Sequence, residues 1–400
     1  DAIDKAFSNY CGGNATFLGN ASSATIGKLW DKSEAHLVFP GPWHDSTCFY
    51  MDIQSGECFK VESDTDSLTP EELLLHEKEV IAADREEIKS FVTHKVWRST
   101  PVSKAELRVM DCIWIRKWKW TLLNGKRIRV IKSRLCVRGF LDPQRHRLTR
   151  HSSTASRLSQ RLHVSLTVQN DWVMESWDIS TAFLQGFSFA LLEKILRLMN
   201  IPIPSMTRKA YIKVPGNVWY HLADLGFPGC PDVHGGDFLA SWWCLELLKA
   251  MYGLCDAPLL WQLCLKYFFI YIVHSFCSTY DDNHFYWKKT ARQLQASATA
   301  HVDDCNVSST QQWLDQTRAL LEKQFGKVKR QLMPMIHVGM MYERIPVGIG
   351  HGGIHLHQEP YCMALKPIEY DKTKKHDVET DAKDQHKFMV CIGGLLHLCL

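Results

Sequence analysis

The sequence lacks the marks of several protein classes. No Cys-x-x-Cys pair occurs among its 14 cysteines, so the spacing of a structural zinc site is absent. The longest unbroken apolar run spans residues 267–273, far short of the ~20 residues that cross a bilayer. Neither sign of charge dominates, because 47 basic residues stand beside 43 acidic ones. The net charge of +4 permits a polyanionic partner without requiring one.

The residues that are present have the composition of a globular protein. Charged residues make up 22% and hydrophobic residues 46% of the 400, which excludes collagen-like, coiled-coil and wholly disordered chains. This length predicts about two to four compact units. Scattered single cysteines suit a reducing compartment. The chain begins at Asp1 without a secretory signal and stops inside an apolar run at 393–400, so we expect a piece of a larger polyprotein.

Local patterns predict a mixture of helices and strands. Thr69 and Glu72 have capping-box spacing, and the apolar repeat after them predicts a helix to about Phe91. Two β-prone runs, 113–122 and 127–137, joined through Asn124-Gly125 predict a hairpin. Further helices are expected at 156–168, 244–251, 259–273, 310–325, 359–366 and 383–399, and strands at 173–179, 297–302, 305–308, 336–343 and 353–357. The order follows no strict βαβ alternation, which favours the α+β class.

Two acidic positions adjoin apolar strands. Asp178 ends the strand expected at 173–179, and Asp303 with Asp304 forms the tip of a hairpin. Carboxylates at the edge of an apolar sheet are costly unless something pairs with them, and divalent metals do this well. Two such ions can support phosphoryl transfer. An Asp pair alone is a weak signal, because Asp281-Asp282 also occurs and has the composition of a turn.

The hairpin expected at 113–137 is dense in cations and aromatic rings. Its members are Trp114, Arg116, Lys117, Trp118, Lys119, Trp120, Lys126, Arg127, Arg129, Lys132, Arg134 and, just beyond, Arg138. Interleaved cations and rings suit phosphates and base faces, which indicates a contact with nucleic acid or a triphosphate. The alternative is a solvated ribbon whose tryptophans pack on a neighbour.

Taken in order, several motifs resemble the reverse transcriptase of copia-type long-terminal-repeat retrotransposons. They lie at 82–87, 114–117, 132–140, 177–186, 248–254 with Ala257, Pro258 and Trp261, 301–304, 338–341, 355–358 with Tyr361, and 391–396. The similarity covers about residues 80–400. Several motifs in the family's order are more specific than any one of them.

The resemblance implies a right-hand polymerase of the α+β class. It would have an irregular lead-in at 1–66, a pre-fingers helix and fingers at 67–170, a palm at 171–345 with a fingers return near 245–262, and part of a thumb or connection at 346–400. The implied activity is RNA-directed DNA synthesis by a Pol polyprotein domain, with deoxynucleotides joined to a primer 3′-hydroxyl.

The resemblance also implies the cofactor and partners. Two Mg²⁺ ions, or Mn²⁺, would be held by Asp178, Asp303 and Asp304, with the Ile179 carbonyl as a further ligand. The expected partners are an RNA template, a DNA primer, a deoxynucleoside triphosphate, and the RNase H and integrase segments of the parent polyprotein, with no membrane. The expected location is the cytoplasm, in the element's virus-like particle if the copy is active.

Five more residues are assigned to substrate binding by the resemblance. Phe183 falls at the sugar-gate position, where a ring would clash with a 2′-hydroxyl group. Lys132 and Arg134 are candidate triphosphate contacts, because fixed cations offset developing phosphate charge. Tyr252 and Gly253 would lie under the incoming base and the template. Ordinary core packing is the alternative for both Phe183 and Tyr252.

Some positions depart from the family's pattern. Cys255 and Asp256 stand where Lys-Gln is usual, Leu259 replaces a basic residue, and His301 replaces a tyrosine. An acid near the template path should weaken polyanion binding. These departures motivate a second hypothesis, a catalytically inactive remnant that acts at most as a nucleic-acid-binding module. A third hypothesis is an unrelated metal phosphotransferase or nuclease.

A loose histidine cluster at His351, His355 and His357 follows a Gly-rich stretch. Residues 355 and 357 would share one face of a strand, so a metal is conceivable. No cysteine or acidic residue is spaced in the sequence to complete such a site.

Overall fold

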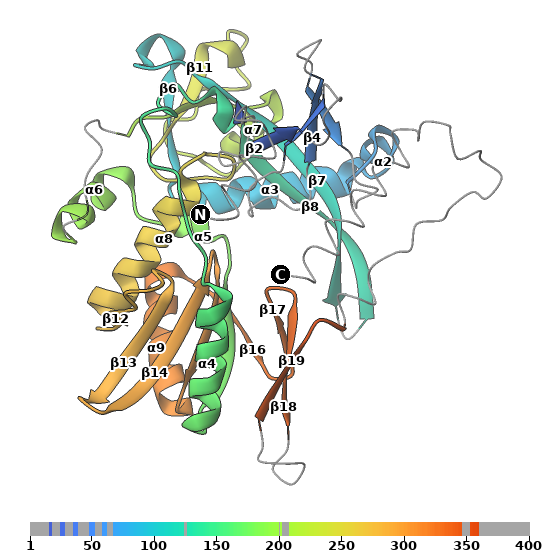
Figure 1. The fold of residues 1–400 in the computed structure, drawn as a ribbon. Coiled ribbons are helices and arrows are strands. Elements are labelled where there is room, and N and C mark those ends of the chain that lie inside the picture. Colours follow the sequence, from blue (N-terminus) through green and yellow to red (C-terminus); the bar gives the residue numbers. More distant parts are fainter. Residues whose placement is uncertain are drawn as a thin grey trace. The chain divides into compact units, whose positions relative to one another are not determined.

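A computed structural model describes residues 16–17, 25–28, 35–38, 48–52, 58–61, 67–123, 126–199, 201, 208–345 and 353–359 (Figure 1). Helices and sheets are mixed, which confirms the α+β class. The chain forms two compact units. Unit 1 comprises Asp1–Ser152 and Thr181–Tyr267, and unit 2 comprises Ser153–Ser180 and Phe268–Leu400. Within the described residues, no helix has the length and apolar character that a membrane span needs. The division into lead-in, fingers, palm and thumb stays a prediction.

Five short strands lie in the segment that the sequence predicts to be irregular. They are β1 (Thr16–Phe17), β2 (Thr25–Lys28), β3 (Ala35–Val38), β4 (Cys48–Asp52) and β5 (Cys58–Val61). They pair antiparallel in chain order. Runs this short give too few positions for an alternation of polar and apolar residues to be recognised.

The first predicted helix is present but is divided at His76 into α2 (Pro70–Leu75) and α3 (Glu77–Thr93). The capping box is confirmed, since Glu72 N–H donates to Thr69 Oγ1 at 3.2 Å and Thr69 N–H donates to Glu72 Oε2 at 2.9 Å. The predicted apolar stripe is wrong in part. Ile88 and Phe91 are buried, whereas Leu74 is 80% exposed.

Unit 1 is built on a five-stranded sheet in the order β6-β11-β10-β7-β8. Its strands are β6 (Trp97–Pro101), β11 (Trp243–Leu247), β10 (Tyr211–Lys213), β7 (Met110–Leu123) and β8 (Lys126–Val137). The Asn-Gly hairpin is confirmed, and Figure 1 shows β7 and β8 as a long twisted ribbon. The helix predicted at 244–251 is wrong, because β11 lies there between β6 and β10. A short apolar run in a central strand has no periodicity that separates it from a buried helix.

Four helices complete the described part of unit 1: α5 (Ala182–Gln185), α6 (Phe189–Leu198), α7 (Gly216–Asp224) and α8 (Ala257–Tyr267). Three short 3₁₀ turns also occur, at Val102–Lys104, Gly139–Leu141 and Ala240–Trp242. The helix predicted at 259–273 is confirmed as α8, and a π-helical turn at Phe268–Ile272 follows it at the start of the second segment of unit 2.

Unit 2 contains a six-stranded sheet in the order β12-β13-β14-β15-β9-β16. Its strands are β12 (Phe276–Cys277), β13 (His284–Thr290), β14 (Gln293–His301), β15 (Asp304–Ser309), β9 (Val173–Ile179) and β16 (Val328–Leu332). Helices α4 (Arg157–Gln169) and α9 (Gln311–Phe325) cover opposite faces of this sheet (Figure 1). The predicted strand at 173–179 and the predicted helix at 310–325 are confirmed.

The helix predicted at 156–168 is confirmed as α4, but the apolar stripe of its sequence, Leu158, Leu162 and Leu166, is not its buried face. Leu158 is 76% exposed and Leu162 is 46% exposed, whereas His163 and Thr167 are fully buried. This polar face of α4 is buried because side chains of the sheet form hydrogen bonds with its polar groups. Ring nitrogens of His163 lie 2.9 Å from Ser297 Oγ and 3.0 Å from Ser308 Oγ. Hydrogen bonds here outweigh the apolar pattern that predicts the buried face.

A second sheet of unit 2 contains β17 (Met335–His337), β18 (Met340–Ile345) and β19 (Gly353–His357). The strand predicted at 336–343 is thus two strands, separated by Val338 and Gly339, which both have positive φ. Tyr342 packs with Met174, Met335 and Val164 in a small core. The helices predicted at 359–366 and 383–399 and the motif at 391–396 fall almost wholly outside the described residues.

Candidate catalytic site

One row of side chains crosses the end of the six-stranded sheet. The strand registers pair His301 with Asp304, Asp304 with Asp178, and Asp178 with Lys329. Residues directly opposite each other in antiparallel strands point to the same face. The turn between β14 and β15 is Val302-Asp303, so the predicted tip at Asp303-Asp304 is displaced by one residue. Asp304 is the first residue of β15 and stands in this row.

Asp303 is held beside the end of β9 by the backbone. Ile179 N–H donates to the Asp303 carbonyl at 3.2 Å, which ties the hairpin tip to the strand that carries Asp178. Val302 has φ +56°, a left-handed conformation that a β-branched residue rarely adopts. The tight turn therefore places Asp303 at the sheet edge that carries Asp178 and Asp304, near enough for its charge to raise the pKa of Asp304. A role of the Ile179 carbonyl as a metal ligand stays a prediction.

The carboxylates of this row affect one another electrostatically. Burial, and then the nearby charges of Asp303 and Asp178, raise the pKa of Asp304 to about 7. Lys329 acts in the opposite direction, and its Nζ lies 2.6 Å from Asp178 Oδ2. Asp178 is 32% exposed and Lys329 is 59% exposed, so solvent reaches this edge. Clustered, partly exposed carboxylate oxygens are the donors that Mg²⁺ and Mn²⁺ prefer, so the residues present fit the implied metal.

Sequence reasoning missed Lys329. Gly326, with φ +73°, ends α9, and β16 begins at Val328 and runs along β9. The local sequence signal available for this residue was a short β-prone run that follows the helix end at Gly326. Nothing in the sequence placed that strand beside Asp178, which is 151 residues away.

A second group of predicted residues gathers within unit 1. The rings of Phe183 and Tyr252 lie 5.7 Å apart at 75°, and the Arg134 guanidinium lies 5.2 Å from the Tyr252 ring. Lys132 and Arg134 are exposed and alternate with the buried Ser133 along β8. Phe183 and Tyr252 are half-buried against the core of unit 1, so both keep part of their surface open.

Gly253 has a structural reason of its own. Its φ is +89°, and a Cβ atom there would lie 2.0 Å from the Val137 carbonyl oxygen. Gly139 approaches in the same way, with its would-be Cβ 2.1 Å from the Gly253 carbonyl oxygen. The contact includes a hydrogen bond from Val137 N–H to the Tyr252 carbonyl at 2.9 Å. Only glycine fits this backbone contact, and the predicted role of Gly253 at the template stays a prediction.

Asp256 does not present a free charge to solvent, which corrects the sequence-based expectation of an acid on a nucleic-acid path. Arg208 Nε lies 2.8 Å from Asp256 Oδ2, and Arg208 Nη2 lies 2.6 Å from Asp142 Oδ2. The side chains are 9%, 3% and 0% exposed for Arg208, Asp256 and Asp142. Burial alone would lower the pKa of Arg208, but the two carboxylates raise it. At this departure from the family's pattern, the acid is buried and paired with an arginine.

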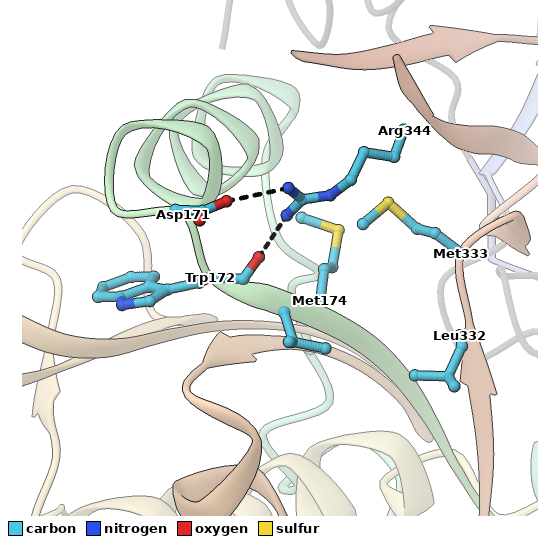
Figure 2. A pocket seen from close by; sticks show the side chains of 7 residues that line it. Asp171, Trp172, Met174, Leu332, Met333 and Arg344 are labelled. Atoms are coloured by element: carbon cyan, nitrogen blue, oxygen red, sulfur yellow. Dashed lines mark hydrogen bonds and ion pairs between the residues drawn. The ribbon is translucent and has the colours of Figure 1, made fainter. Parts of the chain in front are cut away.

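Figure 2 shows a cavity of about 450 Å³ elsewhere in unit 2. Met174, Leu332 and Met333 give it an apolar lining, and Arg344 lies over it, with Nη1 3.1 Å from Asp171 Oδ1 and Nη2 2.6 Å from the Trp172 carbonyl oxygen. None of the predicted site residues lines it.

Comparisons with known proteins agree with the predicted family. No family model matches the chain. Two retrovirus-related Pol polyproteins of Arabidopsis thaliana, from transposons RE2 and RE1, are each 22% identical to it over 281 residues. These matches cover 70% of this chain and 16% of each relative, so the chain spans a small part of their length.

Among solved structures, telomerase from Candida albicans with a fragment of telomeric RNA is 9% identical, with a TM-score of 0.31, over 68% of this chain and 48% of that one. The sequence matches confirm the resemblance that the ordered motifs predict. Over 70% of its length, the chain is therefore similar to part of the Pol polyproteins of these two transposons, as the ordered motifs predict.

Proposed function

We propose that the chain is the RNA-directed DNA polymerase domain of a retrotransposon Pol polyprotein, with fingers, a palm and part of a thumb. The observation that carries this proposal is the pairing of Asp178 with Asp304 across adjacent strands, beside Asp303 in the turn. An unrelated metal phosphotransferase would have to reach this arrangement independently, inside a chain whose other motifs follow the order of the family.

Asp178, Asp303 and Asp304, with the Ile179 carbonyl, would hold two Mg²⁺ or Mn²⁺ ions. When bound, such ions lower the pKa of an attacking hydroxyl group and stabilise the leaving pyrophosphate. The protein's own part is to fix the carboxylates. The β9–β15 register sets Asp178 opposite Asp304, and the bond from Ile179 N–H to the Asp303 carbonyl holds the turn.

The residues grouped around Tyr252 carry chemistry that suits a nucleotide. The exposed cations Lys132 and Arg134 suit a triphosphate, and the half-buried ring of Phe183 suits discrimination against a 2′-hydroxyl group. Tyr252, whose ring meets Phe183 edge-to-face and lies under the Arg134 guanidinium group, would support the base, with Gly253 next to the template. RNA template, DNA primer and other Pol segments are the proposed partners, in the cytoplasm within a virus-like particle.

Primer extension on an RNA template with Mg²⁺ and deoxynucleotides tests the proposal. Asp303→Asn should reduce incorporation by at least about 100-fold, because one charged ligand is lost at the reacting centre. Asp315→Asn is the matched control, since this acid lies on α9, 48% exposed, and pairs with Arg318. Incorporation that is equal in wild type and Asp303→Asn would contradict the proposal.

The same variants distinguish an inactive remnant. Folded wild-type protein that binds template but incorporates no nucleotide would support the remnant hypothesis, which the replacements Cys255, Leu259 and His301 motivate. Thermal unfolding with and without Mg²⁺ then shows whether the carboxylates still bind metal. Mg²⁺ should raise the melting temperature of wild type and of Asp315→Asn, but not that of Asp303→Asn.

A further inference from the structure

We propose a second metal site in unit 2, of different chemistry, formed by Glu343, His355 and His357 on the hairpin of β18 and β19. Glu343 is paired directly with His355 in the strand register, and His357 follows two positions along β19. All three side chains therefore point to one face of the sheet. The opposite face carries Tyr342 and Leu356, which pack in the small core.

The ligand atoms are close enough for one ion. One atom from each of the three side chains lies within 4.8 Å of the others. His357 Nε2 is 3.3 Å from Glu343 Oε2, and the two imidazole rings stack at 4.8 Å and 26°. Tetrahedral zinc with bonds of about 2.0–2.1 Å separates its ligand atoms by about 3.3 Å. The His357–Glu343 pair already has this separation. A rotation of the His355 side chain would bring its ring nitrogen, the third ligand atom, to the same separation from the other two.

The sequence alone did not supply the acidic partner, because Glu343 precedes the histidines by a loop. Within the part of the chain that the structure describes, no lysine or arginine forms an ion pair with Glu343. The neighbouring Arg344 points to the other face and binds Asp171. By contrast, the only other described cluster of this kind, Asp142 with Cys255 and Asp256, already holds the guanidinium group of Arg208.

The surroundings of His357 also suit a metal. Glu359 N–H donates to His357 Nδ1 at 3.4 Å, which leaves the ring proton on Nε2, facing Glu343. An ion at Nε2 would move this proton to Nδ1, which would exchange the long bond from Glu359 N–H for a bond to Glu359 Oε2, 3.8 Å away in this structure. A carboxylate that accepts the second ring proton of a metal-bound histidine is the usual outer partner of such a ligand.

Two imidazoles and one carboxylate select a borderline transition metal such as Zn²⁺ over Mg²⁺, which prefers an all-oxygen set. The proposed site and the Asp178–Asp303–Asp304 cluster should therefore take different ions. A bound ion would join β18 to β19. Its role would be structural, with open positions filled by water, and it is independent of polymerase activity.

The experiment titrates the whole metal-stripped chain with Zn²⁺ in millimolar Mg²⁺, by calorimetry, with Co²⁺ absorption as a second probe. Wild type should bind one Zn²⁺ ion. The variants His355→Gln, His357→Gln and Glu343→Gln should each bind Zn²⁺ at least about 100-fold more weakly than wild type. This loss of affinity is larger than the loss that removal of an outer hydrogen-bond partner would cause. His234→Gln is the matched control, because this exposed histidine lies in unit 1. Its affinity should equal that of wild type.

Hydrogen exchange gives an independent readout that does not depend on any variant. Zn²⁺ should slow amide exchange in β18 and β19 of wild type, and Mg²⁺ alone should not. Failure of wild type to bind Zn²⁺ would overturn the proposal. Equal Zn²⁺ affinity in wild type and all three ligand variants would also overturn it. Asp303→Asn should retain the Zn²⁺ site, so failure of this proposal and failure of the polymerase proposal are distinguishable.

Discussion

Lys329 holds the Asp178 carboxylate from the edge strand β16, at 2.6 Å. An ammonium group in this position competes with a cation for the same oxygen. Lys329→Met should therefore strengthen Mg²⁺ binding in the absence of nucleotide, by roughly 2–5-fold, because a largely exposed pair contributes less than about 1 kcal/mol. Calorimetric titration with Mg²⁺ measures this change.

The control for that titration is Lys323→Met, which removes an exposed lysine from the last turn of α9. It should leave Mg²⁺ affinity unchanged. Weaker binding in Lys329→Met would mean that the ammonium group organises the carboxylates and does not compete with the ion.

Arg208 binds two buried carboxylates, so its removal should be costly. Arg208→Met would leave Asp142 and Asp256 buried without a cation and should lower the free energy of unfolding by about 3–5 kcal/mol. Urea unfolding followed by circular dichroism measures the change. Adding Asp256→Asn and Asp142→Asn to Arg208→Met should restore part of the loss.

Arg98→Met is the matched control for this variant. Arg98 also makes a two-point contact with a carboxylate, Glu246, but it is 64% exposed. Its loss should cost less than about 1 kcal/mol. Equal losses in Arg208→Met and Arg98→Met would show that the buried cluster does not need its cation.

At the scale of elements, the contact of the chain near Gly139 with the chain near Gly253 joins the end of β8 to the loop before α8. Gly253→Ala would place a methyl group 2.0 Å from the Val137 carbonyl oxygen at a φ of +89°. We expect a loss of more than about 3 kcal/mol, from backbone displacement and a strained dihedral together. Thermal unfolding measures it.

Gly216→Ala is the comparison, because a Cβ atom there meets nothing within 4 Å at the start of α7. It should change stability by less than about 1 kcal/mol. A Gly253→Ala protein as stable as Gly216→Ala would mean that the two backbone segments can separate at little cost.

The elements also show which structural information is local. The Asn124-Gly125 hairpin, the capping box at Thr69 and the strand ending at Asp178 depend on neighbours in sequence, and all three were predictable. The identity of β11 depends on the strands beside it, so the sequence wrongly predicts a helix at 244–251. The buried face of α4 depends on Ser297 and Ser308, more than 130 residues away.

The candidate site divides in the same way. The positions of Asp178 at a strand end and of Asp303 and Asp304 at a hairpin were predictable from local signals, whereas their selection as a metal site rests on the resemblance and stays a prediction. Lys329 was not, because only the register of β16 on β9 places it in the row. Glu343 was not predictable either, because only the pairing of β18 with β19 brings it to the histidines.

At the scale of the whole molecule, buried histidines make stability depend on pH. Burial lowers the pKa of His163 to about 3 and that of His337 to about 4, below the ordinary value of 6.5. At pH values between the lowered pKa of each folded histidine and 6.5, the unfolded chain binds more protons than the folded chain. Each histidine therefore contributes a loss of stability as pH falls below about 6.5, up to about 1.4 kcal/mol per pH unit.

His163→Gln isolates one of these contributions. At pH 7 the variant should be less stable than wild type, because the bonds to Ser297 and Ser308 are altered. The difference in free energy of unfolding between wild type and variant should shrink by up to about 1.4 kcal/mol per pH unit as pH falls from 6.5 towards 4. The comparison cancels other titrating groups, including Asp304, whose raised pKa acts in the opposite direction. A gap that stays constant with pH would contradict the burial of a neutral His163.

The position of β9 between β15 and β16 has a consequence for synthesis of the protein. A ribosome makes β9 first, and more than a hundred residues follow before either neighbouring strand exists. Until then, β9 has no partner strand to cover three side chains that are fully buried in the finished sheet, Met174, Trp177 and Ile179. A strand that closes so late is open to wrong partners on the way, as is general for long-range β pairing. The aspartates thus meet only after β15 has been made, and nascent chains interrupted before β15 carry Asp178 without its partners.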